Sequence, residues 1–332
     1  MAVHAYRAIL QETQNKRQEA IFSYLDPRRL EMCIDREDGD RIAIPIRSQD
    51  IAIKLETIFE LHGRQFKKDK KSEEIKPNKI PILPNLAKQL ATVNQDEAKS
   101  TIWFHWLISI FCEGNGDRNQ SARKPPKPNG KRGNWKSKTA LEQLSFPTND
   151  LPKEIVEEFS KHSFLDKNEN LSLKQIKESG CFDNIQDFCE WLDGLWLEYH
   201  LLQKIESIAS KVGIIDYGMD FNIDLAGTEQ GFQFDLAFTY GYQIFAISCT
   251  TSDDRSLCKS KLFEAYLRAQ QMGGSEARVA LLCFAKDIEG IKAEIIDLLS
   301  DKQIKIFGRE HLDSLDHEIF EWLQENDAEL NQ

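Results

Sequence analysis

The strongest constraint on the fold is a succession of regular patterns that fills the chain after residue 184. A long amphipathic stretch over 184–210 predicts a helix, with Gly194 as a candidate break. Alternating apolar and polar residues then predict three strands, over 214–226, 234–239 and 243–249. The remaining elements follow in the order helix, strand, helix, strand, over 256–274, 277–285, 288–302 and 304–312. This order predicts an α/β domain with a mixed sheet flanked by helices.

Composition excludes several classes of protein. The chain has 332 residues, enough for two domains with cores of their own. No apolar run approaches the roughly 20 residues of a membrane helix, and the N-terminus lacks the apolar core of a signal peptide. Seven dispersed cysteines without a CxxC pair indicate reduced thiols, not disulfides or a zinc site. We therefore expect a cytoplasmic protein that is not associated with a membrane.

A basic segment over 118–138 interrupts an otherwise acidic chain. The net charge is −11, whereas this segment has eight Lys and Arg residues and no Asp or Glu. Its many Pro, Gly and Asn residues favour a loop, which is either a solubilising linker or a contact for phosphates. Trp135 adds an aromatic ring that can stack on a base. The candidate nucleic-acid contacts are Arg123, Lys124, Lys127, Lys131, Arg132 and Trp135.

Changes of pattern divide the chain into three parts. Residues 1–65 contain a helical stretch over 1–25, a strand–turn–strand pattern over 28–46 and a capped helix over 48–64. Residues 66–180 form a linker and a helical region that includes the basic loop. The apolar segment 100–112 within it predicts a buried helix, in which we expect His105 to be a packed core residue. Residues 181–332 form the α/β domain.

The element order after residue 184 is that of the restriction-endonuclease-like core. In that fold an acid on the first helix, an Asp on the second strand and a (D/E)xK pair on the third strand meet at Mg²⁺ or Mn²⁺. Hard cations prefer oxygen ligands, and the metal stabilises the charge that builds on the scissile phosphate. Residues two apart on a strand share a face, so the acid and the lysine point to the same site. Asp235, a carboxylate inside an apolar strand, is the first candidate because such a residue needs a partner.

Three segments carry a closer resemblance. "FCEWLDGLWLEYHLLQKI", "FDLAFTYGYQIFAISC" and "KLFEAYLRAQQMGG…ARVALL" together resemble the nuclease domain of CRISPR-associated ancillary nucleases. These proteins of antiviral defence join a CARF domain, which senses cyclic oligoadenylate, to a restriction-endonuclease-like PD-(D/E)XK domain. The resemblance spans about 185–312. Residues 24–64 resemble only the last strands of a CARF domain and the helix that leaves it, so the first 65 residues read as a partial CARF remnant.

The resemblance assigns roles to individual positions and also shows departures. Glu198 matches the helix glutamate and Asp235 the strand aspartate, which makes these two the candidate metal ligands. The family motif is degenerate at three positions, where other residues replace a Glu, a Glu and a Lys: Gln233, Ser248 and Thr250. Hydroxyl groups are poor substitutes for a carboxylate or a lysine at neutral pH. The motif thus loses most of its charge and its water-activating group.

Neighbouring charges offer a remodelled site. Lys259 or Lys261, at the start of the helix after the third strand, is a candidate migrated lysine, and Glu264 a candidate replacement carboxylate. The alternative for each is an ordinary solvated charge. Cys249 has no histidine beside it in sequence, and we expect a buried, unreactive thiol.

Three functional hypotheses remain open. The first is a nuclease relative with an impaired site that serves in nucleic-acid binding or assembly. The second is an active Mg²⁺- or Mn²⁺-dependent endonuclease that uses the migrated residues. The third is a regulatory scaffold that acts as a homodimer, as the resemblance implies. Binding of cyclic oligoadenylate is doubtful, because the N-terminal part lacks room for a complete CARF pocket.

Overall fold

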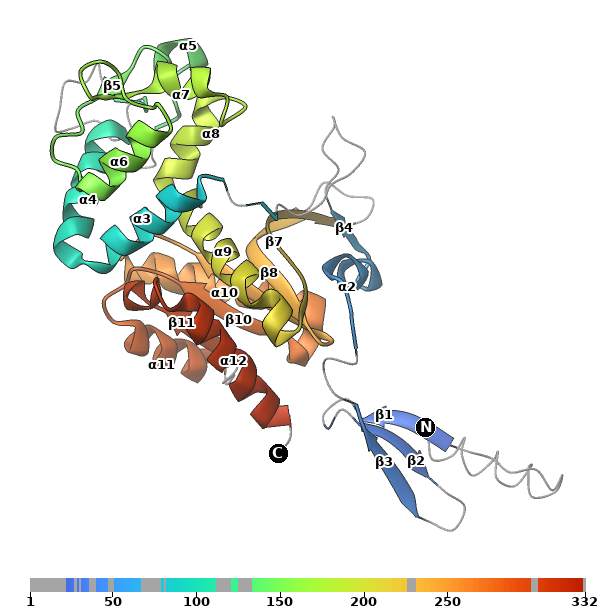
Figure 1. Cartoon of the computed structure of the whole chain (residues 1–332). Coiled ribbons are helices and arrows are strands. Elements are labelled where there is room, and N and C mark those ends of the chain that lie inside the picture. The colour runs from blue at the N-terminus through green and yellow to red at the C-terminus, as the bar shows by residue number, and fades with distance from the viewer. Residues whose placement is uncertain are drawn as a thin grey trace.

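The computed structural model describes most of the chain after residue 82. The described residues are 22–26, 29, 31–35, 40–46, 51–66, 79–80, 82–111, 121–124, 133–225, 231–299 and 304–330. Figure 1 shows the middle helices gathered at one end of the molecule, a large sheet in its centre and a small sheet near the N-terminus. Within the described residues, every helix is too short or too polar to cross a membrane.

The central sheet has six strands in the order β11-β10-β9-β8-β7-β4. Its strands are β4 (Arg64–Phe66), β7 (Ile214–Leu225), β8 (Gly231–Tyr240), β9 (Gln243–Cys249), β10 (Arg278–Leu282) and β11 (Ile304–Phe307). β4, β7, β8 and β9 pair antiparallel, whereas β10 and β11 run parallel to β9 and to each other. The predicted mixed sheet is therefore confirmed, in the predicted order of elements.

Helices cover both faces of this sheet. One face packs against α3 (Pro84–Gln95), α9 (Trp196–Val212) and α12 (Leu315–Leu330). The other face packs against α2 (Leu55–Leu61), α10 (Arg255–Gly273) and α11 (Ile288–Leu299). Because successive residues of a strand point to opposite faces, β9 contributes Ile247 to the α9 side and Ala246 to the α10 side. This double burial explains why β9 is almost entirely apolar.

The long helix predicted over 184–210 is divided at Gly194. α8 (Ile185–Glu190) leads into a π-helical segment, η2 (Trp191–Leu195), and α9 begins at Trp196. Gly194 has an extended backbone with φ of 175°, so the helical dihedrals are interrupted there. Such π segments are common at functional sites. The break places Glu198 in the first turn of α9.

The N-terminal part differs from the prediction in its first strand. β1 (Phe22–Asp26) is a strand where a helix over 1–25 was expected, and residues 1–21 lie outside the described part. β1 pairs antiparallel with β2 (Glu31–Asp35), which pairs with β3 (Arg41–Pro45), as the strand–turn–strand pattern predicted. α2 and β4 pack on the central sheet, because Leu55 and Phe59 are buried against the α10 side.

The middle region is helical and shares its core with α9. Its elements are α3, α4 (Glu97–Phe111), α5 (Lys138–Leu141), β5 (Ser145–Phe146), α6 (Lys153–Lys161), β6 (Leu171–Ser172) and α7 (Leu173–Ser179). Trp103 and Leu107 of α4 are buried, as expected for this apolar segment. The expectation for His105 is wrong: its side chain is exposed and lines a cavity, because it lies on the opposite side of α4 from Trp103 and Leu107.

Candidate functional site

Asp235 of β8 anchors the site, opposite Ser248 of β9. The register that pairs Leu236 with Ile247 places these two side chains across from each other. The Ser248 hydroxyl donates a hydrogen bond to Asp235 Oδ2 at 2.8 Å, and the Cys249 amide donates to the same oxygen at 2.8 Å. Ser248 therefore serves as a hydrogen-bond donor to the aspartate and adds no negative charge.

Lys261 reaches the same place from α10. The helix begins after Asp254, whose carboxylate accepts a hydrogen bond from the Leu257 amide at 2.6 Å and caps the first turn. Lys261 Nζ lies 3.5 Å from Asp235 Oδ2 and donates to the Cys249 carbonyl oxygen at 2.9 Å. An ammonium group thus lies between two oxygens that converge at the end of β9.

Glu198 approaches from the other side of the sheet, and no ion pair to its carboxyl is found within the described residues. Its side chain is 9% exposed, and Oε2 makes no hydrogen bond within the described residues. Burial raises the pKa of this carboxyl well above its usual range, and the charge of Asp235 raises it further, while Lys261 acts in the opposite direction. Burial therefore favours the neutral form of Glu198.

Cys249 is buried between these groups. Burial raises the pKa of its thiol well above the usual range, and the charges of Glu198 and Asp235 act in the same direction. The side chain is 4% exposed. A thiol in such surroundings is protonated and unreactive, as the sequence predicted.

The other departures from the family motif have internal partners. The Gln233 amide donates to the Asp220 carboxylate at 2.7 Å. The Thr250 hydroxyl accepts from the Ser252 amide at 3.2 Å, while the Thr250 amide donates to the Leu282 carbonyl at 2.9 Å. Thr250 therefore stabilises the turn after β9.

The remaining candidates for a remodelled site lie further away. Lys259 Nζ forms an ion pair with Glu294 at 2.8 Å, on the outer side of α10. Glu264 forms an ion pair with Arg268 of the same helix. Glu264 does line a small cavity of about 280 Å³ together with Asp235 and Lys261. The structure thus brings Lys261 to Asp235, and directs Lys259 to another partner.

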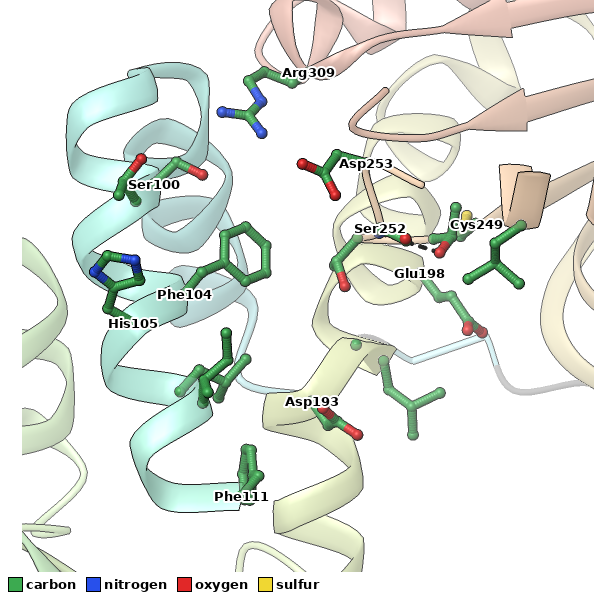
Figure 2. A pocket seen from close by; sticks show the side chains of 18 of the residues that line it. Ser100, Phe104, His105, Phe111, Asp193, Glu198, Cys249, Ser252, Asp253 and Arg309 are labelled. Carbon is green, nitrogen blue, oxygen red and sulfur yellow. Dashed lines mark hydrogen bonds between the residues drawn. The ribbon is translucent and has the colours of Figure 1, made fainter. Parts of the chain in front are cut away.

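A larger cavity of about 820 Å³ lies on the Glu198 side of the site. Its walls come from α4, from η2 and the start of α9, and from the segment 249–253 that follows β9 (Figure 2). Lys261 lines both cavities. Asp235 lines the smaller cavity and Glu198 the larger one.

Sequence reasoning missed four residues of the larger cavity: Phe104, His105, Lys286 and Arg309. They come from α4, from the segment after β10 and from the segment after β11. No motif connects them in the chain, and Phe104 reads as one more apolar residue of a buried helix. Their common position is a consequence of the way α4 packs beside the sheet.

The predicted nucleic-acid contacts lie in the basic segment, of which only part is described. Arg123 forms an ion pair with Asp193 at 2.6 Å and lies over the Trp135 ring at 3.7 Å. Trp135 in turn contacts Phe111 edge-on at 5.0 Å. Lys124 is exposed, and Lys127, Lys131 and Arg132 lie outside the described residues. Arg123 and Trp135 thus attach the described ends of this segment to the helical core.

The fold implies a divalent metal, and the residues present do not fit one. Within the described residues, no group of three or more His, Cys, Asp or Glu side chains is arranged to hold a metal ion. Asp235 Oδ2 already has two hydrogen-bond donors and the Lys261 ammonium around it. Glu198 is the second predicted ligand, and burial raises the pKa of its carboxyl, which disfavours the ionised form that a metal requires. A metal at this place would have to displace Lys261 and ionise Glu198.

Comparisons with known proteins bear on the fold. No protein-family model matches the chain, and no curated protein matches it in sequence. Protein VC1899 from Vibrio cholerae has a TM-score of 0.57 at 14% identity, over 95% of this chain and 72% of that protein. Can2 from Sulfobacillus thermosulfidooxidans, solved in complex with cyclic tetra-adenylate, has a TM-score of 0.54 at 12% identity, over 96% of this chain and 72% of Can2.

A third solved structure is the restriction endonuclease PspGI with its substrate DNA. The alignment covers 74% of this chain and 94% of the PspGI chain, at 11% identity and a TM-score of 0.29. VC1899 and Can2 share their fold with this chain, and sequence identities of 14% and 12% show no more than that.

Proposed function

We propose that this protein has a nuclease fold whose metal has been replaced by a lysine, and that it binds nucleic acid without hydrolysing it. The single observation that carries this proposal is the position of Lys261. Its ammonium lies 3.5 Å from the Asp235 carboxylate and donates to the Cys249 carbonyl oxygen, so a positive charge already lies beside the two oxygens that a cation would approach. A tethered cation at this place excludes a second one by charge repulsion and by volume.

Support for nucleic acid as the partner comes from two sources. The likeness in fold to Can2 agrees with the resemblance of the sequence to CRISPR-associated nucleases. The basic segment 118–138 concentrates positive charge on an acidic chain. We do not extend cyclic tetra-adenylate binding to this chain, because the described residues before 67 form only three antiparallel strands, α2 and β4.

The first test is Mn²⁺ binding by calorimetry, combined with cleavage assays on single- and double-stranded DNA and RNA. We expect no Mn²⁺ binding and no cleavage by the wild type, together with salt-dependent binding of nucleic acid. Lys261→Met should create a weak Mn²⁺ site, because it removes the positive charge beside Asp235 and the Cys249 carbonyl oxygen and keeps the apolar stem. The double variant Lys261→Met with Asp235→Ala should lose that site again. Wild-type cleavage that depends on Asp235 would refute the proposal.

The same contact favours a second candidate function, an active nuclease with a migrated lysine. A lysine within ion-pair distance of the strand aspartate is what that hypothesis requires. The two candidates differ in the effect of Lys261→Met. If Lys261 orients the attacking water, its removal abolishes Mn²⁺-dependent cleavage, whereas our proposal expects a gain of metal binding. Lys259→Met is the matched control, because Lys259 is paired with Glu294.

A further inference from the structure

The described ends of the basic segment, residues 121–124 and 133–136, form a short antiparallel ribbon. An isolated β-bridge joins Arg123 to Trp135. Hydrogen bonds from backbone amides to carbonyl oxygens flank this bridge on both sides, with N–O distances of 2.7 and 3.0 Å. The two ends of the segment are therefore held together where they leave the helical core.

One face of the ribbon is turned towards the helical core and carries Arg123 and Trp135. The Arg123 guanidinium forms an ion pair with Asp193 of η2 at 2.6 Å and lies over the Trp135 ring at 3.7 Å. The side chains of this ion pair are only 13% and 14% exposed. Trp135 in turn packs edge-on against Phe111 of α4. The ion pair and the aromatic stack together fix the orientation of the ribbon.

The other face of the ribbon is turned away from the core. Successive residues of an extended strand point to opposite sides, so Lys124 and Asn134 lie on the side opposite Arg123 and Trp135. Both are exposed. Lys138, the first residue of α5, follows the ribbon closely and is exposed as well. Exposed ammonium groups that are held in fixed positions suit the phosphates of a nucleic-acid backbone.

We propose that this ribbon binds nucleic-acid phosphates through Lys124 and Lys138, and that Asp193 positions the ribbon by holding Arg123. The inference rests on the proposed function, since it names the surface that contacts the nucleic acid. It makes Arg123 a positioning residue and not a phosphate contact. It also gives an acidic side chain a supporting role in the binding of a polyanion.

The two possible roles of Arg123 predict opposite effects of removing Asp193. If Arg123 contacted phosphate itself, Asp193 would compete for its guanidinium, and loss of the negative charge would strengthen binding. If Arg123 positions the ribbon, loss of Asp193 releases the anchor and weakens binding, although the protein becomes less negative. The short distance and low exposure of the ion pair favour positioning, because a phosphate would have to displace Asp193 from an enclosed place.

Fluorescence anisotropy of labelled single- and double-stranded DNA and RNA, titrated with the full chain, tests the inference. Asp193→Asn should weaken binding about tenfold, the change expected for one hydrogen bond to a charged group. Asp193→Glu keeps the carboxylate and should bind like the wild type. Arg123→Gln should weaken binding as much as Asp193→Asn does, and the double variant no more than either. Arg123→Lys keeps the charge but loses the planar fork, and should also weaken binding.

Salt dependence separates contact from support. Lys124→Gln should reduce the slope of log K against log salt by about 0.9 for duplex DNA and about 0.7 for single strands. In the Asp193→Asn background the same change should have little effect, because Lys124 is no longer held against the phosphates. An Asp193 that merely stabilised the fold would not produce this coupling. Lys305→Gln, on the edge strand β11, is the matched control and should leave the slope unchanged.

Glu190→Gln controls for charge. Glu190 is the exposed last residue of α8, and its loss changes the net charge as Asp193→Asn does but leaves the Arg123 ion pair in place. This variant should not weaken binding. Circular dichroism of each variant shows whether it is folded, and Arg123→Lys gives a second test of the anchor should Asp193→Asn not fold.

Two results would count against the inference, and they can be told apart. Nucleic-acid binding by the wild type that Asp193→Asn leaves unchanged or strengthens would overturn the positioning role, and the proposed function would stand. A wild type that binds neither DNA nor RNA would overturn the proposed function and this surface together.

Discussion

Asp235 and Glu198 lie close enough for the charge of one to raise the pKa of the other, and yet their surroundings are opposite. Asp235 receives two hydrogen bonds and an ammonium on a single oxygen. Glu198 is buried beside a cavity, with one oxygen that has no partner in the described structure. The Lys261 ammonium thus compensates the charge of Asp235, whereas burial disfavours the charged form of Glu198.

This contrast shows why two neighbouring carboxyl groups do not by themselves make a metal site. A divalent cation binds where ionised oxygens converge without a cation of their own. Here the Lys261 ammonium lies beside Asp235, and burial raises the pKa of Glu198 and so favours its protonated form. The pair therefore offers a metal ion little net negative charge. The following experiments change one member of the pair at a time.

Removal of the compensated carboxylate should have the largest effect. Asp235→Ala leaves the Cys249 amide, the Ser248 hydroxyl and the Lys261 ammonium without their shared acceptor. We expect the free energy of unfolding in urea at pH 7 to fall by about 3 kcal/mol. Asp235→Asn keeps an oxygen acceptor and should lose only about 1 kcal/mol. Equal losses in the two variants would contradict the assigned role of the acceptor.

The suppressed carboxyl should show its effect through pH. Glu198 has a folded-state pKa above its unfolded value of about 4.5, so its contribution is fully present below that pH and is lost as pH rises through the folded pKa. Glu198→Gln has no such loss. The difference in free energy of unfolding between Glu198→Gln and the wild type should therefore grow in favour of the variant as pH rises above 4.5. The growth is at most about 1.4 kcal/mol per pH unit.

The matched control for this pH series is Glu190→Gln, on the exposed side of α8. It should stay within about 0.5 kcal/mol of the wild type at every pH. A Glu198→Gln difference that is constant from pH 4 to pH 8 would show that Glu198 ionises normally.

A second acid opposite Asp235 should convert the compensated site towards a metal site. Ser248→Glu removes a donor to Asp235 and places a like charge opposite it, and should lower the free energy of unfolding by about 1–2 kcal/mol. When Lys261→Met is added, millimolar Mn²⁺ should recover this loss by binding the folded state, because the competing ammonium is gone. Thermal unfolding with and without Mn²⁺ measures the recovery. The double variant Ser248→Glu with Asp235→Asn should show none.

Removal of the lysines should have the smallest effect on stability. Lys261→Met deletes an ion pair and a hydrogen bond at a partly exposed position, where solvent screens the charges, and should lower the free energy of unfolding by about 0.5–1 kcal/mol. Lys259→Met deletes a surface pair with Glu294 and should change it by less than about 0.5 kcal/mol. Urea titration compares the two variants, and a larger loss from Lys259→Met would contradict the assignment.

Much of the fold was accessible from the sequence, since each element has a local signature. The strands β7 to β11 and the helices α9 to α11 fall where alternation and helical period predicted them, and Gly194 is the break. The final helix α12 was missed, and a helix expected over 1–25 includes the strand β1. The short helix α2 packs on the α10 side of the central sheet through long-range contacts that no local pattern shows.

The sequence by itself determined the chemistry available to this protein. It showed the aspartate in an apolar strand, the glutamate on the preceding helix and the loss of the motif glutamate and lysine at Ser248 and Thr250. Only the tertiary structure decided what these groups do. Packing of α10 selects Lys261 over Lys259 as the partner of Asp235, and packing of α4 beside the sheet buries Glu198 next to a cavity that also holds Arg309. The physical reason is that charge and pKa depend on distance and burial, and both are set by elements far apart in the chain.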